Sequence, residues 1–174
     1  FIKNSLNNED TYFALLTLLN SKLLWYYIKN ASAVFRGGYY VVTPIYIEKF
    51  PFPYLTKSIS NILDSLGEFT FFSKNNEKDL INNTRNFIIS DYLEQIINGC
   101  VYELYFGNEM KKVGVDILGL VEKDLDSVKK LSKEKAIVKL YNIWQEPKNE
   151  VRNRILLMST RCPETIGVIE ENVK

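Results

Sequence analysis

The sequence contains no histidine and only two cysteines. Histidine is the commonest general base and the commonest ligand of bound transition metals, so its absence weighs against both uses. Cys100 and Cys162 lie far apart and form no metal-binding spacing. Two cysteines in 174 residues fit a reducing compartment better than a disulfide-stabilised secreted protein. We therefore expect a cytoplasmic protein with no metal site.

The sequence also lacks any excess of charge, with 22 basic and 21 acidic residues and a net charge of +1. DNA-binding proteins usually carry a basic excess, so DNA binding would require a local basic face. No apolar run is long enough to span a bilayer, and no signal peptide is visible, so we expect no membrane partner. The sequence begins with "FIKN", and we expect it to be part of a longer protein.

Motifs of independent catalysis are missing as well. There is no Walker-type phosphate loop and no nucleophile elbow. The segment "FRGGYY" lacks the third glycine and the downstream acidic residue of a dinucleotide-binding fingerprint. A stand-alone enzyme is therefore the least favoured of the functions considered.

What the sequence does contain begins with an apolar helix. Asn7 and Asn8 can cap a helix, and apolar residues at helical spacing predict one helix over residues 8–30. Trp25, Tyr26 and Tyr27 are consecutive, so they cannot all face one core, and one of them must point towards another segment.

A glycine pair follows this helix. Gly37 and Gly38 end helical propensity, and the aromatic and β-branched residues around them predict a strand over 33–42. Thr43 followed by Pro44 is typical of a helix start, so "PIYIEKF" is expected to be a short helix.

Beyond residue 54, apolar residues at helical spacing predict a mainly helical region. The expected helices cover residues 59–69, 84–105, 109–122, 125–146, 149–159 and 163–172. The predicted fold class is therefore α+β, with a small mixed α/β portion at 1–54 and a mainly α-helical portion at 55–174.

The segment Arg36-Gly37-Gly38 has two interpretations. One is a hairpin turn with an exposed arginine. The other is a DNA contact, because glycines let backbone N–H groups approach a phosphate and arginine can pair with phosphate or guanine. Hydroxyls and positive charge close to the segment in sequence would come from Tyr39, Tyr40, Lys22, Lys29 and Lys49.

The stretch "LLNSKLLWYYIKN", followed by "FRGGYYVVTPIYIEKFPFP", resembles the C-terminal specificity region of type II restriction–modification enzymes that fuse an adenine methyltransferase and an endonuclease. It is also similar to the target-recognition domain of stand-alone adenine methyltransferases, and more distantly to type I specificity subunits. The matching stretches are Leu19–Lys22, the glycine pair with its aromatics, Lys49–Pro53, Val101–Phe106 ("VYELYF") and the closing segment from Asn149 to Glu170. Their order is more specific than any one of them.

The resemblance implies a DNA reader without catalytic groups. In such enzymes this region reads base edges, while the methyltransferase flips an adenine out of the duplex and methylates it from S-adenosylmethionine with an Asn-Pro-Pro-Tyr type motif. This sequence has no such motif and no nuclease motif. The resemblance thus implies double-stranded DNA and the parent's methyltransferase and nuclease domains as partners. It implies S-adenosylmethionine and magnesium for the parent enzyme, and no cofactor for this chain.

By the same resemblance, residues 1–54 are the C-terminal part of a target-recognition domain and 55–174 are a helical scaffold. The expected DNA-binding residues are Arg36, Gly37, Gly38, Tyr39, Lys22, Lys49 and Arg85. The alternative is a helical protein–protein interaction module with no direct DNA contact, which the near-neutral charge favours.

Overall fold

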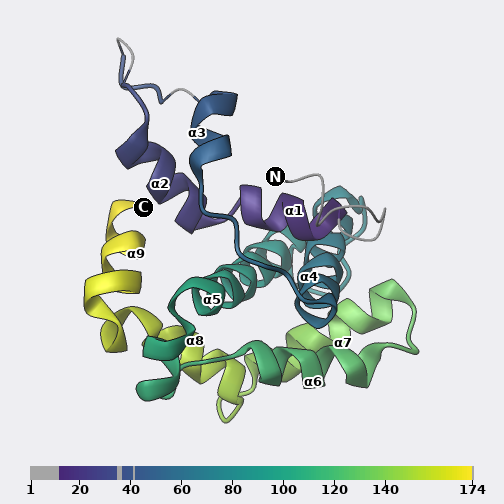
Figure 1. Cartoon of the computed structure of the whole chain (residues 1–174). Coiled ribbons are helices and arrows are strands. Elements are labelled where there is room, and N and C mark those ends of the chain that lie inside the picture. Colours follow the sequence, from purple (N-terminus) through teal and green to yellow (C-terminus); the bar gives the residue numbers. More distant parts are fainter. Residues whose placement is uncertain (1–11, 35–36, 41, 174) are drawn as a thin grey trace.

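The computed structural model describes residues 12–34, 37–40 and 42–173. Its regular structure consists of helices joined by short links (Figure 1). The helices are α1 (Tyr12–Leu19), α2 (Lys22–Ala31), α3 (Pro44–Lys49), α4 (Lys57–Asn75), α5 (Asn86–Lys112), α6 (Leu118–Val128), α7 (Lys133–Gln145), α8 (Glu150–Arg161) and α9 (Val168–Asn172), with a π-helical turn at Pro163–Gly167.

The predicted α+β fold class is wrong, because the described residues form an all-α protein without a strand. The strand expected over 33–42 is reduced to one antiparallel bridge between Val34 and Tyr40. Gly37 and Gly38 lie between the bridged residues with positive φ angles of 104° and 83°. A two-stranded ribbon is marginally stable in water without a third strand or a packed face, so β-propensity alone does not extend this bridge into a sheet.

The single helix expected over 8–30 is two helices where the structure describes it. Ser21 has an extended backbone, its hydroxyl accepts from the Leu24 N–H at 3.2 Å, and it donates to the Leu18 carbonyl at 2.7 Å. The Ser21 side chain thus provides a hydrogen-bond partner for a carbonyl group at the end of α1 and for an N–H group at the start of α2. The short helix expected after Thr43-Pro44 is confirmed as α3.

Helix α5 is the central element, because its buried residues lie on several of its faces. Helix α4 packs along α5, and α1 packs on α4 (Figure 1). A Cβ added at Gly67 of α4 would lie 2.8 Å from Cγ2 of Thr17, so the glycine permits the close approach of α1. Residues from before and after residue 54, such as Leu18 and Leu66, belong to one hydrophobic core.

The C-terminal half of α5 fixes the position of α6. The helix continues past residue 105, where the predicted helix ended, to Lys112, with a kink at Phe106 (φ −117°, ψ 20°). Glu103, which is buried, accepts from the N–H groups of Ile117 and Leu118 at 2.5 and 2.7 Å. The carboxylate therefore caps the N-terminal end of α6, where a negative charge is favoured.

Among the helices that the structure describes, none is long and apolar enough to cross a membrane.

Candidate functional site

The described residues of 32–49 (32–34, 37–40 and 42–49), here called the arm, extend away from the helical body beside α2 (Figure 1). The arm consists of the glycine-containing loop and α3, a helix with no buried residue. Gly37 and Gly38 are exposed, and the Tyr39 side chain next to them is 76% exposed. Apart from Gly38 and its two chain neighbours, no atom of the described residues lies within 4 Å of a Cβ built on Gly38. The backbone there is open to a ligand or to another macromolecule.

One side of the arm rests on α2 through aromatic rings. The Trp25 and Tyr40 rings meet edge to face with centroids 5.6 Å apart. Trp25 is 39% exposed, whereas Tyr26 and Tyr27 are partly buried. The prediction that one of these three aromatics points away from the core is confirmed, and the segment it points to is the arm.

The exit of the arm is anchored by a second aromatic group. Phe50, which is buried, packs against Tyr27 of α2 at 5.1 Å, Phe52 at 5.1 Å and Tyr105 of α5 at 5.8 Å, measured between ring centroids. Burial raises the pKa of Tyr105, and its hydroxyl has no hydrogen-bond partner in the described part of the chain. The side chains of Phe50 and Tyr105 therefore meet through ring packing and not through the Tyr105 hydroxyl.

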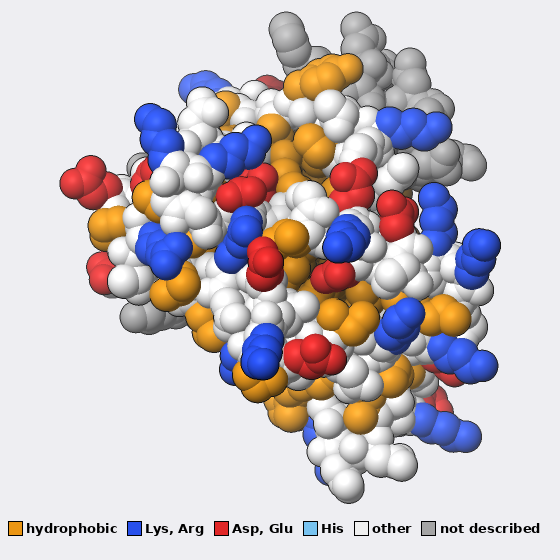
Figure 2. Space-filling view, turned by 90° about the horizontal axis from the view of Figure 1, so that it is seen from below, with side chains coloured by type: hydrophobic (Ala, Val, Ile, Leu, Met, Phe, Trp, Pro, Cys, Tyr) orange, Lys and Arg blue, Asp and Glu red, His pale blue; other side chains and the backbone are white. Residues whose placement is uncertain are grey.

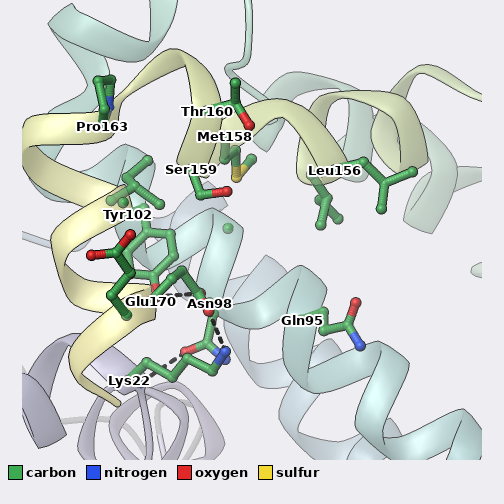
Figure 3. A pocket seen from close by; sticks show the side chains of 15 residues that line it. Lys22, Gln95, Asn98, Tyr102, Leu156, Met158, Ser159, Thr160, Pro163 and Glu170 are labelled. Atoms are coloured by element: carbon green, nitrogen blue, oxygen red, sulfur yellow. Dashed lines mark hydrogen bonds and ion pairs between the residues drawn. The ribbon is translucent and has the colours of Figure 1, made fainter. Parts of the chain in front are cut away.

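The start of α2 is held by polar contacts at one end of a cleft of about 610 Å³ (Figure 3). Lys22 Nζ of α2 lies 2.5 Å from Oε2 of Glu170 in α9. The hydroxyl of Tyr102 in α5 donates to Oε1 of the same carboxylate at 2.7 Å. Glu170 thus joins three helices, and we call Lys22, Tyr102 and Glu170 the clasp.

The polar contacts of the clasp hold helices together. Tyr102 is 2% exposed, and burial, followed by its bond to Glu170, raises its pKa well above the ordinary range. Its hydroxyl therefore stays protonated and remains a hydrogen-bond donor to the carboxylate. The cleft beyond it is lined by amide, hydroxyl and apolar side chains, including Gln95, Ser159 and Leu156.

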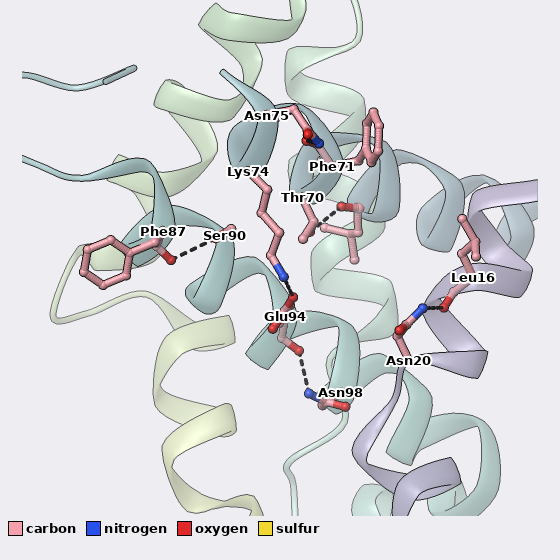
Figure 4. A network of polar contacts seen from close by, with 11 residues as sticks. Leu16, Asn20, Thr70, Phe71, Lys74, Asn75, Phe87, Ser90, Glu94 and Asn98 are labelled. Atoms are coloured by element: carbon pink, nitrogen blue, oxygen red, sulfur yellow. Dashed lines mark hydrogen bonds and ion pairs between the residues drawn. The ribbon is translucent and has the colours of Figure 1, made fainter. Parts of the chain in front are cut away.

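A network of hydrogen bonds and one ion pair connects Lys22 of the clasp to α4 (Figure 4). Asn98 of α5 accepts from the Lys22 N–H at 2.8 Å and donates to the Glu94 carbonyl at 2.8 Å. The Glu94 carboxylate pairs with Lys74 of α4. The first turn of α2 is in this way fixed to the α4–α5 pair.

The residues expected to bind DNA are only partly brought together. Gly37, Gly38 and Tyr39 are consecutive, exposed residues of the loop in the arm, and Lys49 is exposed in the last turn of α3. Arg36 lies outside the described residues. Lys22 is paired with Glu170, so its charge is largely compensated.

Arg85 lies elsewhere. It is exposed at the start of α5, on the order of 20 Å along the helix axis from Asn98, which meets α2. On the face shown in Figure 2, basic and acidic side chains are interspersed, with hydrophobic side chains between them. That face carries no field of one sign of the kind that attracts nucleic acid.

Neither metal binding nor thiol chemistry is indicated in the described part of the chain. No cluster of potential metal ligands occurs there. Cys100 and Cys162 are both buried and free. Burial raises the pKa of Cys162 to about 11, with the nearby Glu109 as a smaller cause, and burial also raises the pKa of Cys100. At neutral pH both thiols are protonated and poorly reactive.

The stretches that carry the family resemblance meet in space. Lys22 belongs to the first, Tyr102 to "VYELYF" and Glu170 to the closing segment, and the three form the clasp. Phe50 of the proline-flanked exit touches Tyr105 of "VYELYF". Comparisons of the chain with protein-family models, curated proteins and solved structures gave no match.

The sequence did not indicate that Lys22 contacts Glu170 and Asn98, or that Tyr102 bonds to the same Glu170 carboxylate. The Lys22–Glu170 pair spans 148 positions, and no local pattern marks such a contact. One signal did exist, because the resemblance singled out the stretches that contain Tyr102 and Glu170.

Proposed function

We propose that this chain is the DNA-recognition part of a restriction–modification enzyme. The arm contacts the duplex, and the helical body is the scaffold that holds the arm. In this proposal the chain positions target DNA for adenine methylation and cleavage by catalytic domains outside it. Those domains bring S-adenosylmethionine and magnesium, and this chain supplies no catalytic group.

The observation that carries the proposal is the exposed glycine-containing loop of the arm. Two adjacent glycines with positive φ angles present open backbone, and an exposed tyrosine hydroxyl stands beside them. Backbone N–H groups and tyrosine hydroxyls are among the usual donors to DNA phosphates. Support also comes from the meeting of the resembling stretches around the base of the arm.

The contacts of the two α2 lysines support a different assignment of the basic residues in this proposal. The Lys22 ammonium is paired with Glu170, and Lys29 donates to the Asn172 carbonyl at 2.7 Å. We therefore assign both to holding the arm. The positive charge that faces phosphate then comes from Arg36 and Lys49, whose charge adds the salt-dependent part of the affinity.

The first test replaces Gly38 in the natural full-length protein. Gly38→Ala adds a methyl group at the open backbone and strains the loop, because alanine disfavours a φ of 83°. We expect about five- to tenfold weaker binding of mixed-sequence duplex DNA by fluorescence anisotropy, the size of effect that loss of one hydrogen bond of ordinary strength produces.

Gly119→Ala is the matched control. Gly119 lies in α6 with open space around it and no positive φ, so the substitution should leave affinity unchanged. If Gly38→Ala and Tyr39→Ala both bound DNA as the unaltered protein does, with equal thermal stability, the arm would not be the DNA-contacting element.

A second candidate function is a protein–protein interaction module. The arm exposes the apolar side chains of Val34, Val42 and Ile45, and Tyr54 beyond its exit is also exposed. Contiguous patches of exposed apolar side chains are typical of protein–protein interaction sites. A concentration-dependent dimer in sedimentation velocity, together with no DNA binding at low salt, would favour this function.

A further inference from the structure

Helix α9 contacts α2, the helix that precedes the arm, at two points. Glu170 pairs with Lys22 at the start of α2, and the Asn172 carbonyl accepts from Lys29 near the end of α2. Figure 1 shows α9 lying beside α2. A contact at each end of α2 resists tilting of that helix as well as its separation from the body.

The second contact leads directly into the arm. Lys29 Nζ, which is held by Asn172, lies 5.9 Å from the centroid of the Trp25 ring. The same Trp25 ring packs edge to face on Tyr40 in the arm. The path from α9 to the arm therefore runs through two side chains of one α2 face, since positions 25 and 29 are one turn apart.

Helix α9 itself is fixed to the body. Tyr102, almost fully buried in α5, donates to the Glu170 carboxylate. In the π-helical turn before α9, the Thr165 hydroxyl lies 3.0 Å from both carboxylate oxygens of Glu109 in α5. Glu170 is thus placed by α5, and its remaining oxygen is aimed at Lys22.

We propose that Glu170 is a positioning residue: through Lys22 it sets the orientation of α2, and so of the arm, relative to the helical body. The structural part of this inference concerns α2 and α9 only. Its consequence for DNA affinity rests on the proposed function. The Glu170 carboxylate interacts with both the buried Tyr102 hydroxyl and the Lys22 ammonium. The Tyr102 hydroxyl fixes the position of the carboxylate, and the carboxylate in turn fixes Lys22 and the start of α2.

The test uses the chain's two tryptophans. Trp144 is fully buried and Trp25 is partly exposed beside the arm, so acrylamide quenching reports mainly on Trp25. We expect Glu170→Gln and Lys22→Met each to raise the quenching constant. Amide exchange of the peptide covering α2 should quicken about two- to fivefold, the range expected when one partly exposed ion pair is lost.

Two comparisons make the result specific to the pair. Glu171→Gln removes the neighbouring carboxylate, which makes no polar contact in the described structure, and should change neither measurement. The double variant should be no more mobile than either single variant, because both remove the same interaction. If Glu170→Gln fails to fold, Lys22→Met carries the test, since the Lys22 side chain is 37% exposed.

DNA affinity of the same variants separates this inference from the proposed function. We expect affinity to fall about two- to fivefold with Glu170→Gln and Lys22→Met but not with Glu171→Gln. Increased quenching in the two variants without any DNA binding by the unaltered protein would support the clasp and contradict the proposed function. Quenching and exchange equal to those of Glu171→Gln would overturn the inference, whatever the DNA affinity.

Discussion

At the scale of single residues, α5 contains two buried tyrosine hydroxyls in opposite situations. The Tyr102 hydroxyl donates to Glu170 at 2.7 Å, whereas the Tyr105 hydroxyl has no partner in the described structure. A buried hydroxyl without a partner costs stability, and one bonded to a carboxylate contributes to it. The two residues are three positions apart on one helix, so each is a control for the other.

Removing each hydroxyl should therefore change stability in different directions. We expect Tyr102→Phe to lower the free energy of unfolding by about 1.5–3 kcal/mol, the value for a hydrogen bond to a charged group. Tyr105→Phe should leave it unchanged or raise it by up to about 1 kcal/mol. Urea unfolding followed by far-UV circular dichroism measures both. Equal destabilisation by the two substitutions would contradict the hydrogen-bond assignment.

At the scale of elements, the cap on α6 is the clearest case of one helix placing another. The Glu103 carboxylate of α5 accepts from two backbone N–H groups at the start of α6. Glu103→Gln keeps the shape and an acceptor oxygen but removes the charge. We expect it to lower the free energy of unfolding by about 1 kcal/mol, because charged acceptors bind backbone donors more strongly at a helix N-terminus.

Glu146→Gln is the control for this substitution. Glu146 is exposed at the end of α7, and its change should stay within about 0.5 kcal/mol of the unaltered protein. Equal urea midpoints for Glu103→Gln and the unaltered protein would mean that the carboxylate contributes nothing to the placement of α6.

Helix formation was predictable from local pattern, but a capping residue marked a predicted helix start in some cases only. Asn149 precedes α8, and its side chain accepts from the Arg152 N–H at 3.0 Å. The strand predicted over 33–42 did not form, because β-propensity yields a stable strand only where neighbouring strands complete a sheet. The break between α1 and α2 depends on Ser21 alone, within a run whose apolar spacing continues across it.

At the scale of the whole molecule, the sequence could not indicate which helices pack together. Lys22 was expected to face DNA because of its charge, yet its partner is Glu170, close to the other end of the chain. An ion pair formed by distant segments leaves no spacing to detect. The arm itself was predictable in outline, from the glycine pair and from the Thr43-Pro44 helix start.

The contacts of Lys22 and Lys29 with α9 also limit which lysines are available for the proposed DNA contact. With Lys22 and Lys29 bound to α9, the described body has no lysine pair left on α2 for phosphate. The net charge of +1 gives no general attraction to nucleic acid either. DNA affinity, on this account, depends on a few contacts from the arm.

The salt dependence of duplex binding by the full-length protein, with and without Arg36→Ala, tests this claim most directly. The account predicts that the logarithm of the binding constant falls linearly with the logarithm of salt concentration. It also predicts that Arg36→Ala weakens binding and reduces the slope by about 1, because one phosphate contact is lost. Binding that is absent at low salt, or that keeps the same slope and affinity in Arg36→Ala, would contradict it.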